Sequence, residues 1–223
     1  MAFIVAVDGP AGSGKGTLAK KIADELNFIN IDTGAMYRCI ALYTIKNQID
    51  IHDTKKIVSE LENIKIELGK ENGKQVVMLN GEVVTDEIRM NEVNNIVSDV
   101  SGIEKVRQKL VVWQRNLAKD KNIVMEGRDI GTVVFPNADI KIFLDASLEA
   151  RVNRRYLEYL EKGMSVSFNE VKESIIQRDE KDRTRKFGTL KKADDAILLD
   201  STNLTIDEVL EKAISIINKK RGK

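Results

Sequence analysis

The stretch that decides the fold of this chain is Asp8-Gly9-Pro10-Ala11-Gly12-Ser13-Gly14-Lys15-Gly16-Thr17. It follows a short apolar run over residues 3–7 and precedes a helical pattern over residues 18–26 whose apolar side chains share one face. A buried strand, a glycine-rich turn and a helix start, in this order, are typical of a phosphate-binding P-loop. Glycines let backbone N–H groups approach a phosphate closely, and the helix amino terminus adds unpaired N–H groups and a positive dipole end.

Two side chains of this loop add to its chemistry. Lys15 supplies a mobile positive charge for the β- and γ-phosphates of a nucleotide, and Thr17 offers a hydroxyl to magnesium. The loop departs from the common G-x-x-x-x-G-K-[ST] pattern because Gly16 follows the lysine, which moves the hydroxyl one residue along. A plain glycine turn is the alternative, and the lysine and both flanks disfavour it. We therefore expect nucleotide phosphate to be bound by Gly9, Pro10, Ala11, Gly12, Ser13, Gly14, Lys15, Gly16 and Thr17.

The composition excludes several classes of protein. The 223 residues include 36 Lys and Arg against 35 Asp and Glu, so the chain lacks the basic excess of a general nucleic-acid binder. The single cysteine, Cys39, excludes an intramolecular disulfide, and we predict that it is a small core residue. The single histidine, His52, cannot build a histidine-rich metal site and is predicted on a surface loop. The apolar runs are too short for a membrane span or a signal peptide, so we expect a cytoplasmic protein.

Four further apolar runs predict strands, and each ends at an acidic residue. They cover residues 28–31, 122–125, 140–144 and 196–199, and the acidic residues are Asp32, Glu126, Asp145 and Asp200. Continuously apolar strands are typical of a parallel sheet covered on both faces. The sequence therefore predicts a five-stranded α/β sheet wrapped by helices. Ligands of such a sheet bind at the carboxyl ends of its strands, where the acidic residues lie.

Helical patterns separate these strands. Residues 103–117 place apolar side chains at spacings of three and four, which predicts an amphipathic helix. Ser167 with Glu170, and Thr205 with Glu208, have the spacing of capping boxes. The second of these predicts the start of a closing helix.

One segment interrupts the α/β pattern. Residues 64–68 alternate between apolar and charged, and Asn80-Gly81 separates two further apolar runs, which is the strongest short-range signal for a β-hairpin. We therefore expect an antiparallel insert over about residues 60–96. It is either a decorative surface hairpin or a substrate-binding flap, because an insert at the ligand edge is able to close over a site.

Arginines gather at three places. Arg38 follows the strand that ends at Asp32, Arg128 follows the strand that ends at Glu126, and a third group lies within residues 177–185. Guanidinium forks bind phosphate oxygens in pairs. The third group by itself is typical of a solvated helix face. Together with a P-loop on one α/β sheet, the three groups favour a second phosphate site.

No side chain stands out as an activated base or nucleophile. A phosphate monoester has a second pKa of about 6, so the attacking oxygen of a nucleoside monophosphate is already anionic at pH 7. Phosphoryl transfer to that oxygen needs alignment and neutralisation of crowded negative charge, which arginines, Lys15 and magnesium supply. A kinase for a hydroxyl acceptor needs a placed carboxylate base instead.

These motifs resemble those of the bacterial cytidylate kinase family, the (d)CMP kinases among the nucleoside monophosphate kinases. The resemblance runs from Ala6 to about Asp207 and includes the glycine after the P-loop lysine. Its most telling strings are residues 8–17, 32–38 (DTGAMYR), 127–136 (GRDIGTVVFP) and 141–147 (KIFLDAS).

The resemblance implies an α/β P-loop nucleoside monophosphate kinase, with a five-stranded parallel sheet wrapped by helices, an antiparallel substrate-binding insert and a helical lid. It implies one P-loop kinase domain over residues 1–223, a monophosphate-binding insert at about 60–96 and a lid at about 151–168. The implied reaction moves the γ-phosphate of ATP to CMP or dCMP with the help of Mg²⁺. We expect a monomer that acts on small molecules and has no nucleic-acid or membrane partner.

The resemblance also assigns roles to individual residues. The implied catalytic residues are Lys15, Arg128 and Arg185. Besides the P-loop, Arg154 would bind ATP, and Thr17 would bind the metal. The implied acceptor site divides into a phosphate part with Thr33, Tyr37, Arg38, Arg128 and Arg185, a cytosine part with Ser98, Arg107 and Asp129, and a sugar part with Arg178 and Asp182. Glu126 stands where some relatives carry aspartate.

Two other functions remain open at this point. A P-loop kinase for UMP or another small acceptor shares the same loop and arginines, and only an acceptor assay separates it from a cytidylate kinase. A nucleotide-dependent regulatory protein with a retired active site is the second alternative. The presence of Lys15, Arg38, Arg128 and Arg185 disfavours it.

Overall fold

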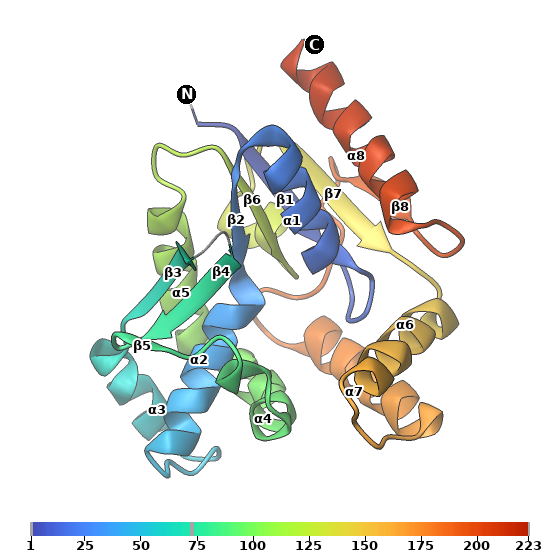
Figure 1. The fold of residues 1–223 in the computed structure, drawn as a ribbon. Helices are drawn as coiled ribbons and strands as arrows, with labels where there is room; N and C mark the ends of the chain where they lie inside the picture. The colour runs from blue at the N-terminus through green and yellow to red at the C-terminus, as the bar shows by residue number, and fades with distance from the viewer. Residues whose placement is uncertain (1, 72–73, 223) are drawn as a thin grey trace. The chain divides into compact units, whose positions relative to one another are not determined.

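The structure, a computed structural model, describes residues 2–71 and 74–222. The chain divides into two compact units (Figure 1). The first contains the residues up to Ile31 and those from Ala118 onward, and the second contains Asp32–Leu117. Each unit has a hydrophobic core of its own.

The first unit is built on the predicted five-stranded parallel sheet. All five apolar runs form strands, with bounds within two residues of those expected. The strand order is β2 (Ile29–Asp32), β6 (Ile123–Gly127), β1 (Ile4–Asp8), β7 (Ile140–Asp145) and β8 (Ile197–Asp200). The predicted α/β fold class is confirmed.

The strand register brings the acidic ends of the strands to one edge. Val7 of β1 pairs with Glu126 of β6, and Asp8 pairs with Phe143 of β7, both in parallel. The central strands are covered on both faces, but the edge strands expose Ile29 by 47% and Leu198 by 56%. The expectation of a sheet covered on both faces therefore holds at its centre and is wrong at its edges, where only one neighbouring strand is present.

Four helices of the first unit matter for the site. α1 (Lys15–Leu26) and α8 (Ile206–Arg221) pack together and against the sheet (Figure 1). α6 (Leu148–Glu161) and α7 (Phe168–Thr184) pack against each other. This second pair, called the α6–α7 hairpin below, has a small core of Val152, Val171 and Ile175.

Two helices begin at the predicted capping boxes. At the start of α7, the Ser167 N–H donates to the Glu170 carboxylate at 2.7 Å and the Glu170 N–H donates to the Ser167 hydroxyl at 3.2 Å. Thr205 and Glu208 repeat the same exchange before α8, at 2.7 and 3.3 Å. Among the described residues, no helix combines the length and the apolar character that crossing a membrane requires.

The second unit combines helices with a small antiparallel sheet. In chain order it contains α2 (Thr33–Lys46), α3 (Thr54–Glu60), η1 (Leu61–Asn63), β3 (Ile66–Glu71), β4 (Lys74–Leu79), β5 (Glu82–Val83), η2 (Glu87–Arg89), α4 (Asn91–Gly102) and α5 (Glu104–Leu117). The three strands fall inside the insert expected at about 60–96, of which residues 72–73 lie outside the described residues. Asn80 and Gly81 join β4 to β5 with φ values of 51° and 88°, the left-handed pair that a tight hairpin turn needs.

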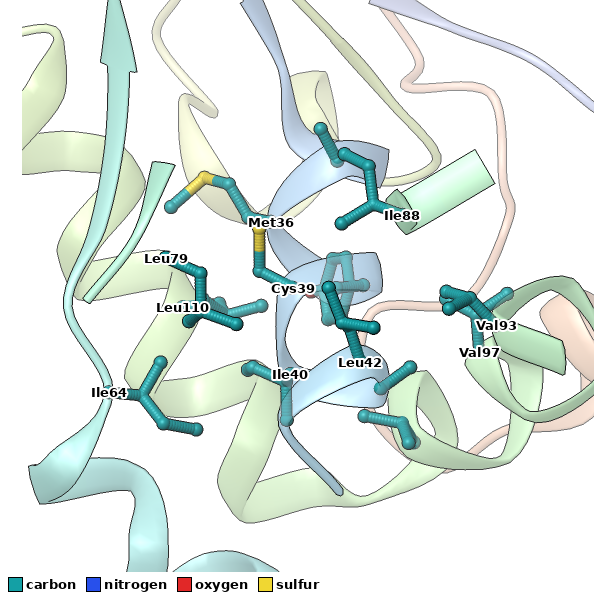
Figure 2. Close-up of a cluster of buried hydrophobic side chains, with 14 of the residues drawn as sticks. Met36, Cys39, Ile40, Leu42, Ile64, Leu79, Ile88, Val93, Val97 and Leu110 are labelled. Carbon is teal, nitrogen blue, oxygen red and sulfur yellow. The ribbon is translucent and has the colours of Figure 1, made fainter. Parts of the chain in front are cut away.

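The core of the second unit forms around α2. Met36, Cys39 and Ile40 of this helix lie against side chains of the sheet and of the other helices, among them Leu79 and Leu110 (Figure 2). Cys39 is fully buried, and burial raises the pKa of its thiol to about 12. The prediction that Cys39 is a core residue is therefore confirmed, as is the exposed position of His52.

Replacing Leu110 by alanine tests this core. Leu110 is fully buried in α5, so Leu110→Ala is expected to lower the free energy of unfolding by about 2–5 kcal/mol. Val112 lies on the same helix but is 53% exposed, and Val112→Ala is expected to change the free energy of unfolding by less than about 0.5 kcal/mol. Urea unfolding followed by the fluorescence of Trp113, the only tryptophan, measures both variants. Equal midpoints for the two variants would contradict the assignment of the core.

Candidate active site

The P-loop lies between β1 and α1, and two of its glycines are required by close packing. A Cβ atom at Gly9 would lie 2.1 Å from the carbonyl oxygen of Leu144 in β7. Gly12 has a φ of 75°, and a Cβ atom there would lie 2.9 Å from the carbonyl oxygen of Arg151 in α6. The loop backbone therefore packs directly on β7 on one side and on α6 on the other.

Lys15 is the first residue of α1, and its side chain returns over the loop. Its ammonium group donates to the carbonyl of Pro10 at 3.2 Å and lies 4.0 Å from the carboxylate of Glu126. Burial and, to a smaller extent, the Arg128 cation lower the pKa of Lys15 to about 7, although Glu126 opposes the change. Thr17 is exposed on the first turn of α1. The loop thus holds a buried, partly neutral amine where anionic phosphates are expected.

Asp182 of α7 joins two of the predicted phosphate-binding arginines. Its Oδ2 accepts from Nε of Arg128 at 2.7 Å, and its Oδ1 accepts from Nη1 of Arg185 at 2.9 Å. Arg185 also donates from Nε to the carbonyl of Gly188 at 2.5 Å. Burial would raise the pKa of Asp182, but the surrounding guanidinium groups outweigh burial and lower it. One carboxylate therefore fixes two guanidinium forks.

A third cation, Arg178, lies near this pair. Burial and, to a smaller extent, the Arg128 cation lower the pKa of Arg178 to about 10. The pKa of Arg128 is raised instead, because the carboxylates of Asp182 and Glu126 outweigh its burial. Lys15 and three arginines thus share the field of a few carboxylates, so that cationic groups are concentrated in this part of the first unit. Lys15, Arg128, Arg178, Asp182 and Arg185, all predicted from the sequence, come together here.

The loop after β6 is anchored by a buried carboxylate at the end of β1. Asp8 accepts from the backbone N–H groups of Ile130 and Gly131, at 2.8 and 2.7 Å. These N–H groups open the short π-helix η3 (Ile130–Val134). Burial raises the pKa of Asp8 to about 6, although both hydrogen bonds oppose the change. The anchor fixes the backbone next to Asp129, the predicted cytosine reader, which is itself buried.

Arg154 of α6 contacts the P-loop. Its Nη1 donates to the carbonyl of Ser13 at 3.3 Å and to the hydroxyl of Ser201 at 3.0 Å. Its Nη2 donates to the carbonyl of Ser201 at 2.5 Å. Arg154, assigned to ATP by resemblance, therefore lies against the loop backbone.

The predicted acceptor residues of the second unit lie on α2, α4 and α5. Arg38 of α2 donates from Nη1 to the side-chain oxygen of Asn94 on α4 and to the carbonyl of Ile88. Asp32 caps α2 by accepting from the Ala35 N–H at 3.0 Å, and its second oxygen accepts from Arg89 at 2.8 Å. Thr33, Tyr37 and Arg38 are all buried on the first turns of this helix.

Arg107 of α5 is held against Tyr37. Its guanidinium carbon lies 5.0 Å from the centre of the tyrosine ring, a cation–π distance. Its Nη1 donates to the carbonyl of Ser101 at 3.2 Å, and the Ser101 hydroxyl donates to the carbonyl of Ser98 at 3.0 Å. Arg107 is only 2% exposed, so its orientation is fixed by packing. Tyr37, Ser98 and Arg107, three predicted acceptor residues, therefore belong to one connected group.

Several partners of these residues were not expected from the sequence. Asn94 holds Arg38, Asp8 holds the loop after β6, and Asp179 holds the P-loop itself. Asp8 ends a strand just before the glycine loop, and this position is the one signal that was available. Asn94 and Asp179 lie in polar helical stretches that resemble solvated surface, and their residue types gave no comparable signal.

Comparison with known proteins shows which family the chain belongs to. The family model for cytidylate kinase matches residues 5–219. The chain belongs to the cytidylate kinase family. It is 49% identical over 215 residues to the cytidylate kinase of Caldicellulosiruptor bescii, with 96% of this chain and 95% of that protein covered. It is 50% identical over 218 residues to that of Fusobacterium nucleatum, with 98% and 96% covered.

One solved structure supports the fold of this cytidylate kinase family member. It is an uncharacterized protein from Eubacterium ventriosum, with a TM-score of 0.54 over 97% of this chain and 98% of that one. Because the two sequences are only 12% identical, the likeness concerns the fold alone.

The low pKa of Lys15 predicts proton uptake when this cytidylate kinase family member binds a nucleotide. Near pH 7 about half of the free protein has a neutral Lys15, and bound phosphates favour the ammonium form. Since the proton must be taken from solvent above pH 7, Kd for ADP is expected to rise with pH, with a slope approaching tenfold per unit. Calorimetry in two buffers of different ionisation enthalpy measures the uptake.

The Lys15→Arg variant provides the control for this prediction. Its guanidinium group stays charged over the same pH range, so it removes the titration while it keeps the positive charge. We expect the pH dependence of Kd for ADP to flatten in this variant. An identical proton uptake in both proteins would show that another group titrates.

Proposed function

We propose that the protein transfers the γ-phosphate of ATP to CMP or dCMP, which gives ADP and CDP or dCDP. The observation that carries the proposal is a cluster of charged side chains. In it, Asp182 accepts hydrogen bonds from Arg128 and Arg185, and Lys15 lies near enough to interact electrostatically with Arg128 and Asp182. In phosphoryl transfer between two nucleotides, several anionic groups crowd around the transferred group. Fixed cations stabilise that charge without reorganising during the reaction.

The reaction needs positioning more than acid–base chemistry. The phosphate of CMP is largely a dianion at pH 7, so its oxygen attacks the γ-phosphorus of ATP without losing a proton to the protein. The bond to the γ-phosphorus forms as the bond to the bridging oxygen of ADP breaks, with the two oxygens in line. In the proposed site, Lys15 neutralises the phosphates of ATP, while Arg38, Arg128 and Arg185 orient the acceptor phosphate.

Mg²⁺ suits the oxygen donors near the P-loop. Thr17 is exposed on the first turn of α1. The Glu126 carboxylate lies close to the adjacent Gly16, because a Cβ atom added there would be 3.5 Å from its Oε1. Mg²⁺ is usually held by one or two protein oxygens together with substrate phosphates and water, so this small donor set fits it. We propose that Thr17 contributes to the metal site. When bound, the ion would neutralise charge on the β- and γ-phosphates.

We assign recognition of the acceptor to three groups of residues. Ser98, Arg107 and Asp129 read the cytosine edge, because cytosine offers an amino donor for a carboxylate, and N3 and O2 are acceptors for arginine and serine. The sugar is contacted by Arg178 and Asp182. The phosphate lies beside Thr33 and Tyr37. In support of this assignment, Arg107 is fully buried and stacked on Tyr37, so its donors are oriented before any base binds.

The proposal includes two segments that close over the substrates, and it includes only small-molecule partners. The insert at about 60–96 would cover the monophosphate, and the segment at about 151–168, with Arg154, would close on ATP. Both expectations follow the resemblance of the chain to nucleoside monophosphate kinases. The protein would act as a monomer on small molecules in the cytoplasm.

A panel of acceptors tests the proposed substrate. With ATP and Mg²⁺, the purified protein is expected to turn over CMP and dCMP with values of kcat/KM at least about 100-fold above those for UMP, AMP and dTMP. A coupled assay for ADP measures all five. Fast turnover of UMP with little turnover of CMP would contradict the cytosine assignment.

The Asp129→Ala variant tests the cytosine reader. Loss of this carboxylate is expected to reduce the ratio of kcat/KM for CMP to that for UMP by about 10- to 100-fold, since a hydrogen bond to a charged group is lost. KM for ATP is expected to stay within about twofold. Asp194→Ala, an exposed site in the same unit, serves as the control and should change neither quantity. If ATP affinity collapses while the preference for CMP persists, the role of Asp129 is wrong.

A further inference from the structure

Two buried charged residues of the α6–α7 hairpin meet beneath the P-loop. Nη1 of Arg151, on α6, lies 2.6 Å from Oδ2 of Asp179, on α7, and each side chain is only 7% exposed. Nε of Arg151 donates to the carbonyl of Ala146 at 3.1 Å, which fixes the plane of the guanidinium group. Burying two charges is costly, and an ion pair alone seldom offsets that cost. The additional hydrogen bonds of the pair are therefore its informative feature.

Both members of the pair contact the same P-loop residue. Oδ1 of Asp179 accepts from the N–H of Ala11 at 3.2 Å, and Nη1 of Arg151 donates to the carbonyl of Ala11 at 2.9 Å. The two backbone polar groups of Ala11 are thus held by partners of opposite charge. The backbone of Arg151 also lies close to Gly12, the next residue of the loop. Its carbonyl oxygen leaves no space for a Cβ atom at Gly12.

These contacts fix two successive peptide planes of the loop. In a trans peptide the carbonyl and the N–H point in opposite directions. Since the Ala11 N–H points to Asp179, the carbonyl of Pro10 points the other way, and it is this carbonyl that accepts from the ammonium of Lys15 at 3.2 Å. Since the Ala11 carbonyl points to Arg151, the N–H of Gly12 points away from α6. The pair therefore determines which backbone groups of the loop are turned inward.

We propose that Arg151 and Asp179 are positioning residues for the donor nucleotide, and that they act through the backbone of Ala11. They fix the orientation of the Pro10–Ala11 and Ala11–Gly12 peptides, and with it the site of Lys15 and the N–H groups available to phosphate. This inference deepens the proposed function and rests on ATP as the donor. Arg151, at the start of the segment expected to act as a lid, thus serves as an anchor of that segment to the P-loop.

The double variant Arg151→Met/Asp179→Leu tests the proposal. It removes both charges together, so no buried charge is left unpaired, and such replacements often preserve stability. We expect KM and Kd for MgATP to rise at least about tenfold, while KM for CMP stays within about twofold. Hydrogen exchange at the Ala11 amide is expected to become faster, because its acceptor is gone. Unchanged affinity for MgATP in the folded variant would overturn the proposal.

Two further variants separate positioning from simple support of the hairpin. Val171→Ala removes a buried side chain of α7 from the core shared with Val152 and Ile175, and should lower Tm while leaving KM for MgATP within about twofold. If it raises that KM as much as the double variant does, the pair only supports the hairpin and the proposal fails. If the double variant does not fold, Asp179→Ala, which also removes the acceptor of the Ala11 N–H, is judged by the same criteria.

The wild-type protein distinguishes failure of this inference from failure of the proposed function. If the wild-type protein does not phosphorylate CMP with ATP, the proposed function itself is wrong. If the wild-type protein is active and the folded variants keep its affinity for MgATP, only the role of Arg151 and Asp179 is wrong.

Discussion

Mutual repulsion among buried cations is the constraint on which the active part of the first unit depends. Lys15, Arg128 and Arg178 lie close enough that the cation of Arg128 lowers the pKa of both others. Asp182 makes this concentration of charge tolerable, because each of its oxygens accepts from a different guanidinium group. In the proposed function, anionic phosphates would relieve the repulsion that remains among these cations.

The carboxylates around the P-loop serve mainly to hold other groups. Asp8 fixes the backbone before η3, Asp179 fixes the P-loop, and Asp182 fixes two arginines. In the second unit Asp32 caps α2 and binds Arg89. A reaction between two phosphates needs no carboxylate base, and carboxylates are then free to act as rigid acceptors. Their geometry is consistent with chemistry that relies on alignment.

The parts of the structure that the sequence predicted are those with local signals. The strands follow from apolar runs that end at acids such as Glu126, the starts of α7 and α8 follow from capping boxes, and the hairpin follows from Asn80-Gly81. The residues of the P-loop and the arginines were recognised by type and spacing. Their partners were not, because Asp8 and Ile130 are 122 residues apart, and Ala11 and Asp179 are 168 apart. Charged residues on helices such as Asp179 look solvated until the fold shows what they touch.

Cys39 lies directly after Tyr37 and Arg38 on α2, and its side chain belongs to the core of the second unit. Its neighbours in sequence are predicted to bind the acceptor, whereas its thiol is sealed in the core with a pKa of about 12. Only the thiolate reacts readily with oxidants and electrophiles, so this sulfur is chemically silent at physiological pH. Because the chain has no other cysteine, oxidants and reductants that act on thiols are expected to leave the folded protein unchanged. Since Cys39 is buried and unreactive, a thiol-reactive label would attach only to a cysteine introduced at the surface.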